Sequence, residues 1–206
     1  MHPFLSLLLI AGTLALGAMS PGPTFVVVAK NAISLSRRHG FATALGSGLG
    51  ACLFALIALS GLHAVFRAVP LLFWIFKVAG GLYLIYLASK ILRHARQPIM
   101  SGEGLKNGTT LRQAFRFGLT TQLSNPKTAV FFAGLFSALL PSQMPGYFFL
   151  VLPLIAWMID SSWYAAVAFL LSSEKPRNTY LRCKTIIDRS CGGVLALLGV
   201  KLVLSQ

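Results

Sequence analysis

The sequence contains few charged residues, and the acidic ones are scarcest. Of its 206 residues, 11% are charged, four are Asp or Glu, and the mean hydropathy is +0.75. A soluble domain has about 25% charged residues. The chain also lacks a polar stretch long enough to form a separate soluble domain. We therefore predict a single transmembrane domain over residues 1–206.

Cysteine is also scarce, since the chain has three cysteines, Cys52, Cys183 and Cys191. An odd number without metal-ligand spacing does not indicate a disulfide framework or a zinc site. The four histidines and four acidic residues are scattered, without a nucleophile–base pair or a metal-binding cluster. We therefore expect no metal, no cofactor and no enzymatic activity.

Positive charge is abundant, because 18 Lys and Arg residues give a net charge of +14. Such an excess can indicate nucleic-acid binding. Here the basic residues lie mainly in short segments between apolar stretches, so membrane topology explains them better. We expect the lipid bilayer as a partner and no nucleic acid, and a homodimer is left open.

The apolar stretches predict six transmembrane helices, and hence an all-α polytopic membrane protein. The predicted spans cover residues 4–34, 41–66, 69–92, 111–140, 147–172 and 185–204. The first and fourth spans are longer than a membrane crossing requires. Each of these two contains a proline motif, "SPGPT" from Ser20 and "SNPKT" from Ser124.

Basic residues concentrate in the odd-numbered loops between these spans. They are Arg37 and Arg38 in the first loop, Arg93, Arg96 and Lys106 in the third, and Lys175, Arg177, Arg182, Lys184 and Arg189 in the fifth. The second loop has Arg67 alone and the fourth has none. By the positive-inside rule the odd-numbered loops are cytoplasmic, which places both termini outside.

The two proline motifs suggest an internal repeat, because Ser20 and Ser124 are 104 residues apart, about half the chain. A later pair of segments, "KVAGGLYLIYL" and "RSCGGVLALLG", also matches. We predict repeats over residues 1–96 and 111–206, joined by a linker over 97–110. Three spans per repeat would insert the copies in opposite orientations, as in many secondary transporters. Chance similarity between apolar segments is the alternative.

Proline ends or kinks a helix, so each motif predicts a break followed by a restart. Asn125 suits the N-cap and Pro126 the first helical position, and Ser20 and Pro21 suit the same roles in the first span. Helix N-termini attract anions and helix C-termini attract cations. Two facing breaks would therefore suit a zwitterion, whereas two plain kinks that aid packing are the alternative. The candidate binding residues are Ser20, Pro21, Gly22, Pro23, Thr24, Gln122, Ser124, Asn125, Pro126, Lys127 and Thr128.

Two ionisable residues, Lys127 and Asp160, are predicted to lie deep in the membrane. Each costs about 2.5–3.5 kcal/mol at the centre of a span, so such residues usually serve a function. A purely structural Lys–Asp pair is the alternative. Asp160 is the candidate proton carrier, because a substrate ammonium group could replace its proton.

Several glycines are spaced for close helix packing. Gly46 and Gly50 are four residues apart, and two Gly-Gly pairs begin at Gly80 and Gly192. Small residues at such spacing let helix backbones approach each other. We expect these glycines to lie at helix–helix contacts.

The sequence resembles the LysE/RhtB amino-acid exporters over essentially its whole length. The resemblance lies in "MSPGPTFVVVAKNAISLSRRHGFATALGSGLG", "GGLYLIYLASKIL" and "NPKTAVFF". It implies a bacterial inner-membrane protein that exports amino acids, driven by the proton gradient. The matching signature residues are Pro21, Gly22, Pro23, Asn125, Pro126 and Lys127, and Asp160 is a looser match.

The resemblance leaves the substrate open between basic amino acids, such as lysine or arginine, and a homoserine- or threonine-type substrate. The predicted membrane interior has few acids besides Asp160. This favours neutral or small polar amino acids. A passive channel or a membrane scaffold is the alternative from another functional class, and transport driven by a gradient would exclude both.

Overall fold

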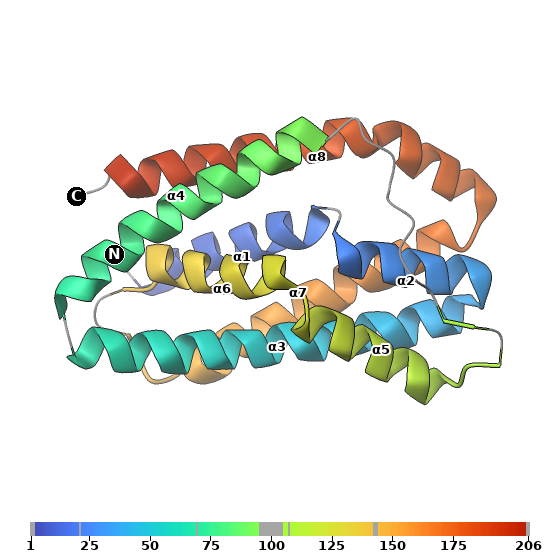
Figure 1. Cartoon of the computed structure of the whole chain (residues 1–206), viewed down its shortest axis with the longest axis horizontal. Coiled ribbons are helices and arrows are strands. Elements are labelled where there is room, and N and C mark those ends of the chain that lie inside the picture. Colours follow the sequence, from blue (N-terminus) through green and yellow to red (C-terminus); the bar gives the residue numbers. More distant parts are fainter. Residues whose placement is uncertain are drawn as a thin grey trace.

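The computed structural model of the chain describes residues 3–20, 22–68, 70–94, 105–106, 108–141 and 144–204. Within these ranges the secondary structure consists of eight α-helices without strands, which confirms the all-helical fold (Figure 1). The helices are α1 (Pro3–Met19), α2 (Pro23–Ser34), α3 (Arg37–Ala68), α4 (Pro70–His94), α5 (Leu111–Leu123), α6 (Pro126–Leu139), α7 (Phe148–Leu171) and α8 (Glu174–Leu204).

The first and fourth predicted spans are each broken into two helices, as the proline motifs predicted. The first consists of α1 and α2, which meet at an angle of 57°. The fourth consists of α5 and α6. Both breaks lie near the middle of the molecule, although they are far apart in sequence (Figure 1).

Two described helical segments, Arg37–Gly61 and Phe148–Leu171, are individually long and apolar enough to cross a membrane. The bent pair of α1 and α2 makes a third when it counts as one span, and Lys127–Leu139 is a shorter apolar helix. These segments are typical of a multi-pass membrane protein. The arrangement of six spans in two repeats stays a prediction.

The helix that contains the last predicted span begins before that span. The span is predicted to start at residue 185, and α8 begins at Glu174. The basic segment predicted as the fifth loop is therefore largely the first part of this helix. Lys and Arg have good intrinsic helix propensity, so a charged segment can extend an apolar helix beyond the hydrocarbon.

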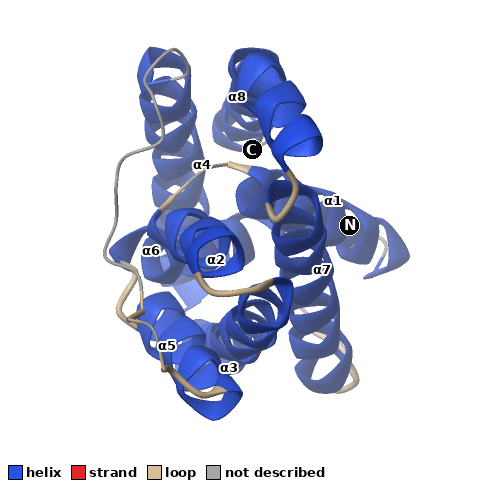
Figure 2. Ribbon diagram, turned by 90° about the vertical axis from the view of Figure 1, so that its right-hand side faces the viewer, coloured by secondary structure: helices blue, strands red, loops and turns tan. Residues whose placement is uncertain are grey.

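Figure 2 looks along the long axis of the molecule and shows α2 and α6 in the middle of the bundle. Helices α3 and α5 lie together on one side of this pair, and α4 and α8 lie together on the other. Helix α7 packs along α3 and also contacts α1 and α2. One half of each broken span, α2 and α6, therefore lies between longer helices.

Glycines allow α3 to approach α5 closely. A Cβ atom added at Gly46 would overlap the carbonyl oxygen of Phe115, and one added at Gly118 would overlap the carbonyl oxygen of Thr43. Gly50 leaves room for the side chain of Gln122 in the same way. The predicted role of Gly46 and Gly50 in packing is confirmed.

The two Gly-Gly pairs differ from this pattern in one position. A Cβ atom at Gly80 would overlap the carbonyl oxygen of Gly134 on α6, and one at Gly192 would crowd Leu92 on α4. Nothing lies within 4 Å of a Cβ placed at Gly193, so the packing prediction is wrong for that glycine. Neighbouring residues on a helix point about 100° apart, so one contact seldom involves both.

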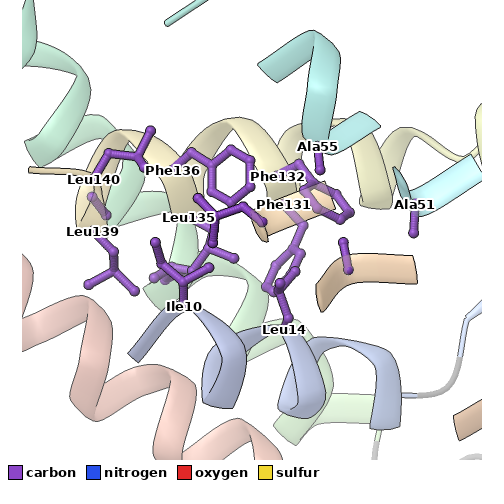
Figure 3. Packing of buried hydrophobic residues seen from close by; sticks show 14 of the residues in the cluster. Ile10, Leu14, Ala51, Ala55, Phe131, Phe132, Leu135, Phe136, Leu139 and Leu140 are labelled. Atoms are coloured by element: carbon purple, nitrogen blue, oxygen red, sulfur yellow. The ribbon is translucent and has the colours of Figure 1, made fainter. Parts of the chain in front are cut away.

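Buried apolar side chains form two separate clusters. The larger one joins α1, α3, α4, α6, α7 and α8, and Figure 3 shows Ile10 and Leu14 of α1 facing the Phe131 and Leu135 side of α6. The smaller one joins α2, α3 and α7 around Phe25. On α3 and α7, a buried polar residue separates the part of the helix that belongs to one cluster from the part that belongs to the other. Ser47 lies between Ala44 of the smaller cluster and Ala51 of the larger, and Asp160 lies between Tyr164 and Ala156 in the same way.

The described parts of the first, third and fifth predicted loops lie close together. Arg37 Nε donates to Ser172 Oγ (2.9 Å), which joins the start of α3 to the end of α7. Leu105 N donates to Asn31 Oδ1 (3.1 Å), which joins the segment before α5 to the end of α2. The N- and C-terminal ends of the chain lie at the opposite end of the molecule (Figure 1).

Candidate functional site

The two helix breaks occur at matching positions of the proposed repeat. Helix α1 ends at Met19 and α5 ends at Leu123, which are 104 residues apart, the same offset that aligns the two motifs. Asn125 is the N-cap of α6 and Pro126 is its first residue, as predicted.

The restart of the first span differs from the prediction. The N-cap of α2 is Gly22 and its first residue is Pro23, so Ser20 is not the N-cap. Pro23 fits the first helical position as well as Pro21 would, because proline lacks the N–H that is unpaired there. Ser20 instead binds the side chain of Lys127. Pro21 lies outside the described residues.

The two restarts also differ in how their N-termini are capped. Asn125 Oδ1 accepts from the backbone N–H of Lys127 (3.1 Å), and the Asn125 carbonyl accepts from the N–H of Thr128 (3.1 Å). The first N–H groups of α6 are therefore already used by the protein itself. Gly22 provides no side-chain cap for α2. An anion at the start of α2 would therefore not compete with a capping side chain of Gly22, as it would with Asn125 at the start of α6.

Lys127 brings a cation from the second break to the first. Its Nζ donates to both the carbonyl oxygen and Oγ of Ser20, each at 3.0 Å. It also lies beside Gly22, since a Cβ placed there would be 3.5 Å from Nζ. The ammonium group and the N-terminus of α2, where Gly22 provides no side-chain cap, therefore form one positive region.

Asp160 of α7 is buried and is bound by two polar side chains. Ser47 Oγ of α3 donates to Asp160 Oδ2 (2.7 Å), and Gln122 Nε2 of α5 donates to Asp160 Oδ1 (3.3 Å). Thr24 Oγ1 of α2 donates in turn to Gln122 Oε1 (2.6 Å), and Asn125 Nδ2 donates to Thr24 Oγ1 (3.4 Å). One continuous hydrogen-bonded chain therefore links the carboxylate to both helix breaks.

A pocket at this point brings together residues of both breaks and both predicted intramembrane charges. Its polar lining consists of Gln122, Asn125, Lys127, Thr128, Asp160 and Tyr164. Gly22 lies at one side of it, and the rest of the lining is apolar, including Leu14, Phe131 and Ile159. Lys127 and Asp160 share the pocket, although each is hydrogen-bonded to other side chains rather than to the other.

The predicted candidates fall into three groups in the structure. Six of them, Gly22, Gln122, Asn125, Lys127, Thr128 and Asp160, line the pocket. Ser20 and Thr24 are buried behind it, bound to Lys127 and Gln122. Pro23 and Ser124 are exposed and lie outside the lining. The structure describes the Pro126 backbone, but not its side chain.

Two further buried polar residues near this site, Ser47 and Asp188, are not among the candidates predicted from the sequence. Ser47 holds Asp160, but a serine between glycines in an apolar helix gives no specific signal. Asp188 of α8 is also buried, and its charge acts on Lys127. Its position three residues inside a predicted span was a usable signal, because buried acids are rare in membranes. In the part of the chain that the structure describes, no group of three or more metal-ligating residues gathers to hold a metal ion.

The fold and the site define a helical membrane protein with a polar, charged pocket between two broken helices, as in membrane transporters. The chain belongs to the LysE type translocator family, whose family model matches residues 15–206. It is therefore a transporter of that family and not an enzyme. This confirms the resemblance found in the sequence.

Two similar proteins are threonine efflux proteins. The one from Salmonella typhi is 32% identical over 195 residues, which cover 91% of this chain and 92% of that protein. The one from Escherichia coli K12 is 32% identical over 199 residues, with the same coverage of both chains. An uncharacterized membrane protein of Haemophilus influenzae is 29% identical over 190 residues. No solved structure matches this chain.

Proposed function

We propose that this protein exports small neutral or polar amino acids of the threonine type across a bacterial inner membrane in exchange for protons. The observation that carries the proposal is the shared pocket, which places Lys127 and Asp160 beside two helix breaks in an otherwise apolar interior. Family membership and the threonine efflux proteins among the relatives support amino acids as the substrate.

The pocket provides one partner for each charge of an amino-acid zwitterion. The carboxylate would lie between Lys127 Nζ and the N-terminus of α2 at Gly22, where both groups favour an anion. The ammonium group would lie against Asp160. The apolar wall around Leu14 and Phe131 would then receive a short side chain. A second ammonium group, as in lysine, would have no further acid in the described lining.

Exchange of substrate for protons follows because the proton and the substrate ammonium group compete for the same Asp160 carboxylate. A substrate ammonium group that binds the carboxylate displaces its proton, and a proton that binds displaces the ammonium group. Ser47 and Asp160 separate the two apolar clusters along α3 and α7, and these clusters would open alternately, so that the site faces one side at a time. We place the six spans in two inverted repeats. The odd-numbered loops, which carry most of the basic residues, would then lie in the cytoplasm and both termini outside.

Transport in proteoliposomes tests this function directly. Purified protein is reconstituted with radiolabelled threonine, and uptake is followed with and without a pH gradient. A gradient of about one pH unit supplies about 1.4 kcal/mol per proton, so one-to-one exchange predicts about tenfold accumulation of threonine. Without a gradient, we expect saturable exchange and no accumulation.

Competition by unlabelled amino acids defines the substrate in the same assay. Threonine, homoserine and serine should inhibit uptake of labelled threonine, whereas lysine and arginine should not. Stronger inhibition by lysine or arginine would instead indicate a basic amino-acid exporter. Non-saturable flux that does not respond to the pH gradient would indicate a channel and contradict the proposal.

A further inference from the structure

Among the described residues that line the pocket, Gln122 is the one whose side chain joins Asp160 to the helix breaks. The side chain is 3% exposed and belongs to the last turn of α5. Its Nε2 donates to Asp160 on α7, and its Oε1 accepts from Thr24 on α2. We propose that Gln122 is the coupling residue of the transporter, whose amide rotates when Asp160 binds a proton; this inference rests on the proposed function.

The orientation of the amide depends on the ionisation of Asp160. A carboxylate only accepts hydrogen bonds, so it binds the NH₂ group of Gln122 and directs the carbonyl oxygen towards Thr24. When an O–H bond forms at Oδ1, that oxygen becomes a donor and a poorer acceptor, so its bond from Nε2 weakens. Rotation of the amide by about half a turn restores a good bond, with Asp160 donating to Oε1.

This rotation changes the hydrogen bonds at both helix breaks. It would turn the NH₂ group towards Thr24 Oγ1, which now donates to Gln122 and accepts from Asn125 Nδ2. Thr24 Oγ1 would become an acceptor from Gln122, and its own proton would need a new partner. Thr24 belongs to the first turn of α2 and Asn125 is the N-cap of α6. Protonation of Asp160 would therefore change the hydrogen bonds at the N-termini of both α2 and α6.

The surroundings of Gln122 restrict motion to the end of its side chain. Gly50 packs against the stem, since a Cβ placed there would lie 2.8 Å from Gln122 Cβ and 2.9 Å from Cγ. The backbone carbonyl of Gln122 also accepts from the N–H of Asn125 (3.1 Å), which holds the end of α5 in place. The terminal amide torsion is broad and can change without moving these atoms.

The side chains around Asp160 can be sorted by whether they titrate and by whether they connect it to the helix breaks. Among the described residues that line the pocket, the titratable groups facing Asp160 are Lys127 from α6 and Tyr164 from its own helix. Helices α3 and α5 present Ser47 and Gln122, which are not titratable. Ser47 Oγ binds the other carboxylate oxygen, so it can hold Asp160 while the bond to Gln122 changes.

The test compares two rates in proteoliposomes for each variant, namely threonine accumulation driven by a pH gradient and threonine exchange at equal pH. For Gln122→Leu we expect the accumulation ratio under a gradient of about one pH unit to fall from about ten to about one, while exchange falls by a smaller factor. Thr120→Val is the matched control on α5. Its hydroxyl bonds within its own helix, so it should behave as wild type.

Thr24 provides the second arm of the test. Thr24→Val removes the hydroxyl without changing the shape of the side chain and should uncouple transport as Gln122→Leu does. The double variant should be no worse than either single one, because both break the same chain of bonds. Thr24→Ser keeps the hydroxyl and should restore accumulation. The Thr24 variants also decide the question if Gln122→Leu does not fold.

The outcomes distinguish this inference from the proposed function. Accumulation by Gln122→Leu and Thr24→Val equal to wild type would overturn the coupling role, and so would an equal loss of accumulation and exchange. If Asp160→Asn also accumulated threonine as wild type does, the proposed proton carrier itself would be wrong. If Asp160→Asn lost accumulation and the Gln122 and Thr24 variants kept it, Asp160 would still be the proton carrier. The coupling role of Gln122 would then be rejected.

Discussion

Replacing Asp160 by asparagine is expected to abolish threonine accumulation driven by a pH gradient. The carboxamide has nearly the same shape and keeps an oxygen that can accept from Ser47 Oγ, but it cannot bind and release a proton at physiological pH. With a gradient of about one pH unit, the accumulation ratio in proteoliposomes should fall from about ten to about one. Exchange at equal pH should fall by a smaller factor, because the binding groups at Lys127 and α2 remain.

Asp188 supplies the control for this prediction. Like Asp160 it is a buried acid, but it lies on α8 and does not line the pocket. Asp188→Asn should weaken threonine exchange, because the Asp188 charge acts on Lys127, but should keep the response of accumulation to the pH gradient. Asp160→Glu should retain part of that response because it keeps a carboxyl group. If Asp188→Asn lost accumulation and Asp160→Asn kept it, Asp188 would be the proton carrier.

The helix breaks could be predicted from the sequence because proline acts on its own backbone. Pro126 after Asn125 combines a residue that cannot continue a helix with a good N-cap, and the structure has this restart. The first motif contains two prolines, each of which can begin a helix. Local preference does not choose between them, and the restart at Pro23 rather than Pro21 came as a correction.

The contacts of the candidate site were much less predictable than its residues. Lys127 and Asp160 stood out because ionisable residues are costly in a membrane. Their partners Ser20 and Ser47 depend on how helices distant in sequence are placed, and a serine hydroxyl can also bond its own helix. The chain from Asp160 through Gln122 to Thr24 spans three helices, so no single segment of sequence contains a signal for it.

The packing of α3 against α5 positions this chain of bonds. Ser47 lies between Gly46 and Gly48 on α3, and Gln122 lies four residues after Gly118 on α5. Close approach of the two backbones at the glycines brings both polar side chains within reach of Asp160. A change that separates the two helices should therefore weaken both the fold and the site.

Gly46→Ala is expected to be strongly destabilising, although it adds one methyl group to a helix and alanine is the better helix former. The new Cβ would overlap the backbone carbonyl of Phe115, which cannot move aside as a flexible side chain can. Overpacking of this kind costs about 1–3 kcal/mol and occasionally more. For a chain of this length the upper value corresponds to a melting temperature lower by about 6–12 °C, which thermal unfolding of the detergent-purified protein would measure.

Gly61→Ala is the matched control, because it makes the same change in the same helix. Nothing lies within 4 Å of a Cβ placed at Gly61. Alanine should therefore stabilise α3 there by about 0.5–1 kcal/mol, through the lower conformational entropy of the unfolded chain. The two substitutions thus have opposite predicted signs. Equal melting temperatures for the two variants would mean that contact between the α3 and α5 backbones does not hold the site together.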